Sequence, residues 1–132
     1  MGKYVYPVIL TPEEEGYFVS FPDIESCYTQ GDNLADALEM AKDVLALRMC
    51  AYENDKKIIP PASLKQNFIL NENQIISLVS ADTMEYRKMW DSKAVKKTLT
   101  IPAWLNTLAE SNGINFSAIL QKALKDEMQL VE

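Results

Sequence analysis

The sequence predicts an α+β protein built in two parts. Short apolar runs separated by turn residues fill the first thirty positions, and a run with the 3.6-residue helical period follows at 34–45. The last third of the chain holds one alternating run, followed by two short amphipathic segments. The predicted order is β-β-β-α-β, with the helix on one face of a sheet, and then a strand and two helices.

The first part begins with a predicted hairpin. Residues 4–10 and 17–21 are rich in β-branched and aromatic side chains, and a turn ending at Gly16 separates them. Pro7 favours an edge position for the first strand, because proline cannot donate to a ladder of hydrogen bonds. A short third strand is predicted at 26–29.

A long helix is predicted next. Asp32 or Asn33 can cap it, and it should run to about Tyr52. A connection over residues 56–73 then leads to a fourth strand at 74–80, which would rejoin the sheet. The apolar face of this helix comprises Leu34, Ala37, Leu38, Ala41, Val44 and Leu45.

The second part begins with an alternating run at residues 96–102. Leu99 and Ile101 fall on one face of this predicted strand. One short strand alone is not stable, so we expect the same strand of a second copy to complete an antiparallel ribbon. Such a ribbon fits the major groove of DNA. The other face carries Lys96, Thr98 and Thr100.

Two helices should follow this strand. Pro102 suits the first position of a helix, and Gly113 suits a left-handed cap at its end. Asn115 is a good N-cap for the second helix. Apolar residues recur in that helix at helical spacing: Phe116, Ile119, Leu120, Ala123, Leu124 and Met128.

The order of strand, helix, glycine turn and helix over about residues 96–128 resembles the ribbon-helix-helix fold of small bacterial and phage repressors. The strand parity makes Lys96, Thr98 and Thr100 the candidate base contacts. The candidate phosphate contacts are Lys93, Lys97, Asn115 and Ser117. The candidate dimer core comprises Leu99, Ile101, Leu105, Leu108, Ile119 and Leu120. The alternatives are a solvated strand with two packed helices that bind no DNA, and helix capping alone for Asn115 and Ser117.

The composition excludes several classes of protein. The chain has 132 residues, 48% of them hydrophobic and 24% charged, as in ordinary globular proteins. It holds no run of 18 apolar residues and no signal-peptide core, so we expect no membrane span and a cytoplasmic location. Cys27 and Cys50 should be reduced thiols. Without histidine, two cysteines are too few for a zinc site, and histidine-based catalysis is excluded. We expect neither metal nor cofactor.

The charge is unevenly distributed along the chain. Residues 1–90 hold 8 Lys and Arg against 14 Asp and Glu, whereas residues 91–132 hold 5 of each. The acidic first part suits a basic protein partner better than a nucleic acid, although solubility alone would also explain its charge.

Two motifs in the first part point to a family. Gly-Tyr-Phe-Val-Ser-Phe-Pro-Asp-Ile at 16–24 and Thr-Gln-Gly-Asp-Asn-Leu-Ala-Asp-Ala-Leu at 29–38 resemble the HicB antitoxin family. The resemblance implies a degenerate RNase H-like domain at 1–81, a helical linker at 82–95 with a short helix over 84–90, and a ribbon-helix-helix segment at 96–132. It also implies a small basic RNase toxin, HicA-like and with a double-stranded-RNA-binding-like fold, as the partner of the first domain.

An enzyme is not expected. A two-metal nuclease of the RNase H type needs several carboxylates, beginning with one in the middle of the first strand, and residues 4–10 have none. Glu13, Glu14 and Glu15 lie in the adjoining turn, where a solvated run of charge is the simpler explanation. The fold would be present without its chemistry.

The expected function is therefore that of a type II antitoxin. It would neutralise its toxin and, as a homodimer, repress its own operon by binding operator DNA. A tetramer or larger assembly would form if the sheet edges also paired. The alternative is a stand-alone HicB-like transcriptional repressor without a toxin. A third hypothesis is an oligomeric interaction protein that does not bind DNA.

Overall fold

The computed structural model divides the chain into two compact units, Met1–Lys93 and Ala94–Glu132. It describes residues 2–64 and 68–130. The middle of the predicted connection, at 65–67, and the last two residues of the predicted C-terminal segment lie outside the described residues, as does residue 1. The predicted boundaries at 81 and 95 remain predictions.

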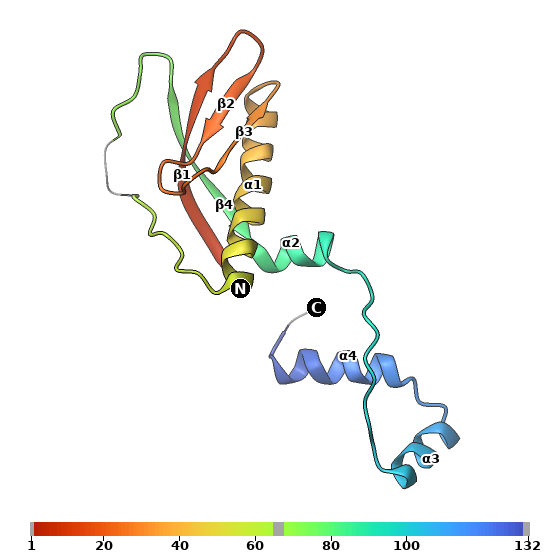
Figure 1. Cartoon of the computed structure of the whole chain (residues 1–132). Helices are drawn as coiled ribbons and strands as arrows, with labels where there is room; N and C mark the ends of the chain where they lie inside the picture. Colours follow the sequence, from red (N-terminus) through yellow and green to blue (C-terminus); the bar gives the residue numbers. More distant parts are fainter. Residues whose placement is uncertain (1, 65–67, 131–132) are drawn as a thin grey trace. The chain divides into compact units, whose positions relative to one another are not determined.

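The first unit contains a four-stranded antiparallel sheet (Figure 1). Its strands are β1 (Lys3–Pro12), β2 (Tyr17–Ser20), β3 (Tyr28–Gly31) and β4 (Ile75–Asp82). Their order across the sheet is β3-β2-β1-β4. The predicted α+β class and the β-β-β-α-β order of elements are confirmed.

The turn between β1 and β2 depends on glycine. Gly16 has a φ of +97°, and its carbonyl oxygen accepts a hydrogen bond of 2.9 Å from the amide of Glu13. A Cβ at this position would collide with the carbonyl oxygen of Gly31, because Tyr17 is the register partner of Gly31. Side chains other than hydrogen are therefore disfavoured here by both conformation and space.

Two predictions about the strands are wrong. Strand β1 is central, not at an edge. The ladder with β2 begins only at Ile9, so Pro7 lies in a part of β1 that is paired with β4 alone. Strand β3 begins two residues later than predicted, because Ser26 adopts a φ of +54° and interrupts the extended run.

The long helix α1 (Leu34–Asp55) covers one face of the sheet (Figure 1). Asn33 caps it, as predicted, since its side chain accepts a hydrogen bond of 2.8 Å from the amide of Asp36. The helix ends at Lys56, which has left-handed backbone angles. Of the predicted apolar face, Leu34 is exposed, whereas the other members pack into or against the core. The core between α1 and the sheet includes Tyr6, Val8, Leu10, Val19, Ala37, Ala41, Leu45, Met49, Val79 and Ala81.

A short helix, α2 (Thr83–Trp90), follows β4 directly and confirms the helix predicted over 84–90. Asp82 caps it, with its side chain accepting hydrogen bonds from the amides of Met84 and Glu85. Helix α2 lies against α1 and belongs to the first unit.

Glu53, near the end of α1, holds three parts of the first unit together. Its Oε2 accepts hydrogen bonds from the hydroxyl of Tyr4 on β1 (2.7 Å) and from that of Thr83 (2.9 Å). Its Oε1 forms an ion pair with Arg87 at 3.1 Å. Burial raises the pKa of Glu53, but the hydrogen bonds from Tyr4, Thr83 and Arg87 outweigh that effect and lower it overall. Burial, followed by the bond to Glu53, raises the pKa of Tyr4 to about 12.

The second unit contains two helices, α3 (Ala103–Ser111) and α4 (Phe116–Glu127). Gly113 has a φ of +65° and forms the predicted left-handed cap, in which the amides of Gly113 and Ile114 donate to Glu110 and Ala109. Pro102 lies at the N-cap position, one residue before the predicted first helical position, with a ψ of 142° that is not helical. None of the helices in residues 2–64 and 68–130 combines the length and the apolar character that a membrane span requires.

The Glu53 cluster predicts a pH dependence of stability. Replacing Glu53 by glutamine should lower the free energy of unfolding by about 1.5–3 kcal/mol near neutral pH, because hydrogen bonds to a charged group are lost. The pKa of Glu53 is lower in the folded than in the unfolded chain, so its contribution is present above the unfolded pKa. That contribution disappears as the pH falls through the folded pKa.

Urea unfolding of wild type and Glu53→Gln at about pH 7 and about pH 3 measures this effect. The difference in stability between the two proteins should shrink at the lower pH. A difference that is the same at both pH values would show that the charge of Glu53 contributes nothing.

Candidate functional site

The predicted DNA-binding residues lie in two places. The lysines and threonines lie in the segment before α3, and Asn115 and Ser117 lie at the start of α4. Residues 91–102 belong to no helix or strand in this single chain, and Figure 1 draws them as a coil. Thr98 and Thr100 are exposed in this segment, as are Lys96 and Lys97. The predicted strand needs a second chain to pair with, so it remains a prediction.

The segment before α3 lies against α4. A hollow of about 710 Å³ has walls from both, and Leu99 lines it together with Leu120 and Leu124 of α4. Lys96, Lys97 and Ser117 line the same hollow. The structure therefore gathers two predicted dimer-core residues with three predicted DNA contacts. Lys93 belongs to the first unit, so its position relative to this group is not defined.

Asn115 caps α4, as predicted. Its side-chain oxygen accepts a hydrogen bond of 3.1 Å from the amide of Ala118. Ser117 lies in the first turn of the same helix and is exposed. A helix begun in this way directs amide groups outward at its N-terminal end, which is the geometry that binds phosphate oxygens.

The apolar residues of the second unit are not covered. None of residues 94–130 is buried, although α3 and α4 both carry apolar side chains at helical spacing. Of the six predicted dimer-core residues, only Leu120 is half-buried, and the other five are exposed: Leu99, Ile101, Leu105, Leu108 and Ile119. Large exposed apolar surfaces of this kind mark sites of association.

The first unit presents a second surface, the face of the sheet turned away from α1, which we call the open face. Side chains alternate along a strand, so the residues that alternate with the buried core residues lie on this face, as Val5 and Leu78 do on β1 and β4. Phe18 and Tyr28 lie next to one another there, with ring centroids 5.9 Å apart. The open face was not predicted from the sequence. The sequence pattern that could have predicted it is the pair of aromatic residues, Phe18 on β2 and Tyr28 on β3, on the side of these strands that does not face the core.

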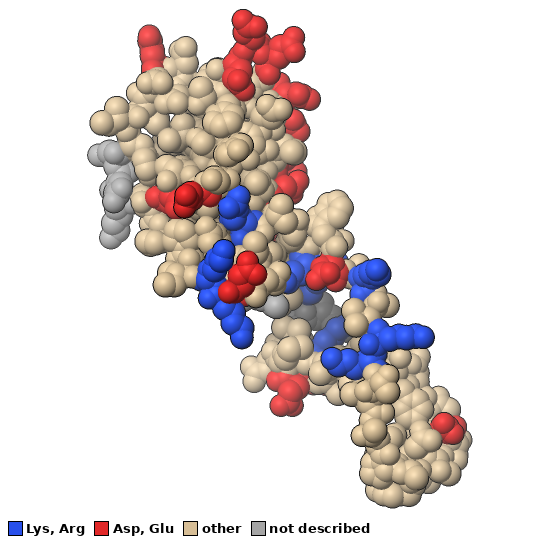
Figure 2. Space-filling view, in the orientation of Figure 1, with Lys and Arg blue, Asp and Glu red and all other residues tan. Residues whose placement is uncertain are grey.

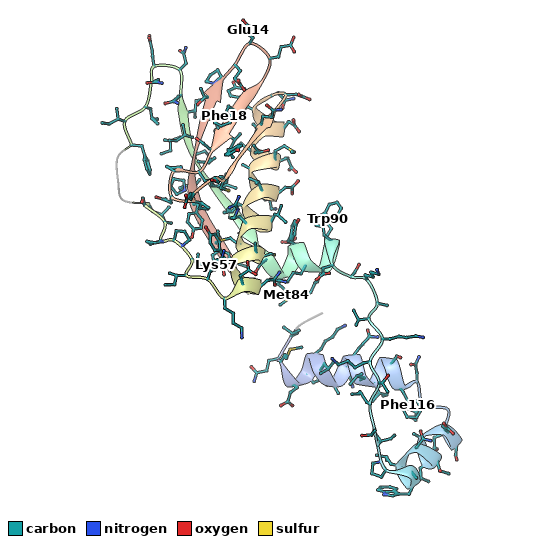
Figure 3. The ribbon with its side chains drawn as sticks, viewed as in Figure 1. Glu14, Phe18, Lys57, Met84, Trp90 and Phe116 are labelled. Carbon is teal, nitrogen blue, oxygen red and sulfur yellow. The ribbon has the colours of Figure 1, made fainter. Side chains whose placement is uncertain are left out.

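Acidic residues surround one end of this unit. Figure 2 shows them gathered at the end that carries the β1–β2 turn, where Figure 3 labels Glu14. Glu13, Glu14 and Glu15 occupy that turn and are exposed. Strand β1 itself holds no carboxylate, and in the described part of the chain no group of three or more His, Cys, Asp or Glu residues could hold a metal ion.

The chain is similar to known antitoxins over its first unit. The family model described as HicB_like antitoxin of bacterial toxin-antitoxin system matches residues 5–79. Antitoxin HicB 1 of Photorhabdus laumondii is 50% identical over 66 residues, which are 48% of this chain and 43% of that protein. Antitoxin HicB of Escherichia coli K12 is 46% identical over 68 residues, which are 48% and 49% of the two chains. The chain thus spans about half the length of these curated relatives.

Two solved structures resemble it as well. A chain of a toxin-antitoxin complex from Streptococcus pneumoniae has a TM-score of 0.59 and 29% identity, covering 95% of this chain and 99% of that chain. A chain of a HicA3 and HicB3 toxin-antitoxin complex has a TM-score of 0.51 and 27% identity, covering 60% of this chain and 99% of that chain. The family match extends over more than half of the residues, so this chain belongs to the HicB-like antitoxin family of bacterial toxin–antitoxin systems.

Proposed function

We propose that this chain is the antitoxin of a type II toxin–antitoxin pair. Its first unit, a degenerate RNase H-like domain without nuclease chemistry, would bind and neutralise a HicA-like RNase toxin. Its second unit would dimerise and repress the operon of the pair by binding operator DNA. Membership of the family supports the first role, as do similar chains solved in toxin–antitoxin complexes.

The observation that carries the second role is the absence of any buried residue in 94–130. Two short helices and an unpaired segment cannot keep this many apolar side chains in water and remain ordered alone. A second copy supplies both missing elements at once: a partner strand for residues 96–101, and an apolar surface for α3 and α4. The product is a ribbon-helix-helix dimer with two-fold symmetry.

Strand parity then decides which side chains reach DNA. In the ribbon, Leu99 and Ile101 face the helices, so Lys96, Thr98 and Thr100 face outward. These three would contact base edges in the major groove. Lys93, Lys97 and the N-terminal end of α4 at Asn115 and Ser117 would contact phosphates. Lys93, Lys96 and Lys97 are all exposed.

The alternative is a stand-alone HicB-like repressor without a toxin. It predicts operator binding, but no complex with the product of the neighbouring gene. Co-purification of the full chain with that gene product, followed by a mobility-shift assay on the operon's own promoter, separates the two proposals. An oligomeric protein that shifts no promoter fragment would contradict both.

Dimerisation should depend on Ile101. Ile101→Asp places a charge in an apolar interface that is built from both chains, which is strongly unfavourable. We expect light scattering to report a smaller assembly for this variant at concentrations where wild type is dimeric. Lys122→Asp, a change of charge on exposed α4, serves as the matched control and should leave the mass unchanged. An unchanged mass for Ile101→Asp would contradict the shared ribbon.

The ribbon also predicts opposite effects for neighbouring residues. Thr98→Ala and Thr100→Ala should leave the melting temperature nearly unchanged, because exposed substitutions cost little. Each should weaken operator binding by about 1 kcal/mol, near the lower end of base-contact energies. Leu99→Ala should lower stability by about 2–5 kcal/mol in the dimer and weaken DNA binding only through loss of that dimer.

Thermal unfolding and operator titration on the three variants test the parity. Loss of folding in Thr98→Ala, together with a merely altered operator preference in Leu99→Ala, would mean that the opposite face meets the DNA. Lys96→Ala should weaken binding as well. If the slope of the logarithm of the binding constant against the logarithm of the salt concentration decreases in magnitude by about one, Lys96 contacts a phosphate.

The first unit alone should neutralise the toxin. Residues 1–93 form a compact unit with its own core, so this fragment should fold, inhibit RNA cleavage by the neighbouring gene product and fail to bind operator DNA. The matched fragment 94–132 should not inhibit cleavage. Inhibition by 94–132 and none by 1–93 would reverse the assignment of roles.

A further inference from the structure

We infer that the open face of the sheet is the surface on which the first unit binds a small basic protein. This inference rests on the proposed function, in which that protein is the toxin, and it adds the surface and the residues that make the contact.

The open face has the composition of an interface core. Between Val5 and Thr11 on β1, and along β2 and β3, its residues carry no charge. Lys3 and Asp82 stand at one end of it as register partners. Protein interfaces are depleted of charge and enriched in aromatic residues at their centres. Pro7 on this face is buried and Ile9 is half-buried, whereas five apolar residues of the face have exposed fractions between 37% and 61%: Val5, Phe18, Tyr28, Ile76 and Leu78.

The aromatic pair is the natural anchor. Phe18 is opposite Gln30 in the register and Tyr28 is opposite Ser20, so the two rings are diagonal neighbours on β2 and β3. Tyr28 is 61% exposed although it is a large aromatic residue in a strand. Exposed aromatic side chains on a rigid sheet contribute much of the binding energy where a partner covers them.

Exposed acidic residues beside the open face favour a basic partner. We call these residues the acidic rim: Glu13, Glu14, Glu15 and Glu72. Pro12 is the register partner of Tyr17, and Leu10 that of Ile75, so the β1–β2 turn lies at the same end of the sheet as the start of β4. Glu13, Glu14 and Glu15 are exposed in that turn, and Glu72 is exposed just before β4. A second copy of this unit would bring equal negative charge to the contact, whereas a basic protein would meet opposite charge. Figure 3 labels Glu14 at the turn and Phe18 on the strand that follows.

Binding of the full chain to the purified product of the neighbouring gene tests this surface. Tyr28→Arg and Leu78→Arg change exposed residues in the two halves of the open face, and each should weaken binding tenfold or more. Leu47→Arg is the matched control, because Leu47 is 56% exposed on α1, away from this face, and should bind within twofold of wild type. Circular dichroism on each variant establishes that it is folded.

The acidic rim has a test of its own. Replacing Glu13, Glu14 and Glu15 together by glutamine should slow association and flatten its dependence on salt, with little change in the dissociation rate. An unchanged association rate at low salt would contradict the role of charge in selecting the partner.

The outcomes separate the surface from the function. Binding of both Tyr28→Arg and Leu78→Arg within twofold of wild type would overturn the open face while leaving toxin binding intact. Weakening by Leu47→Arg alone would overturn it too, and would place the contact on α1. A smaller assembly of the face variants without loss of toxin binding would mean that a second copy covers the face. A wild-type chain that does not bind the gene product at all would overturn the toxin pairing itself.

Discussion

The second unit depends on one constraint, which is that its apolar side chains find no cover within their own chain. Residues 94–130 hold two helices, α3 and α4, yet none of their side chains is buried. The hydrophobic effect therefore favours association of this unit with a second surface. The proposed ribbon would cover these apolar side chains. It would also supply hydrogen-bond partners for the backbone of residues 96–101. DNA binding would then be a consequence of dimerisation, because the lysine and threonine face exists only when the strand is formed.

The first unit, in contrast, has a buried core of its own. Its helix α1 and its four strands bury a continuous core within the unit. The Glu53 cluster joins β1, α1 and α2 through hydrogen bonds and an ion pair. The open face of its sheet stays uncovered, and it carries exposed aromatic and aliphatic side chains beside the acidic β1–β2 turn. A stable domain with such a face is suited to binding another protein, and this property agrees with the HicB-like family to which the chain belongs.

The features that the sequence predicted well are local. Asn33, Gly113 and Asn115 act as caps in the structure because each needs only the backbone within a few residues. The features predicted badly are not local. The central position of β1 depends on where β4 returns, which Pro7 cannot indicate. Glu53 bonds directly to side chains 30 to 49 positions away, and no motif signals this cluster. The proposed base-contact residues Lys96, Thr98 and Thr100 lie on a segment without regular structure in the single chain, so their orientation would depend on a second chain.

Hydrogen exchange at the amides of residues 96–101 in the full-length protein tests the shared ribbon most directly. In a ribbon, alternate amides of this segment donate to the partner strand and should exchange far more slowly than an unstructured peptide. Protection should disappear on dilution below the dissociation constant of the dimer. Exchange at the rate of an unstructured peptide, at concentrations where light scattering reports a dimer, would contradict the ribbon and place the contact between copies elsewhere.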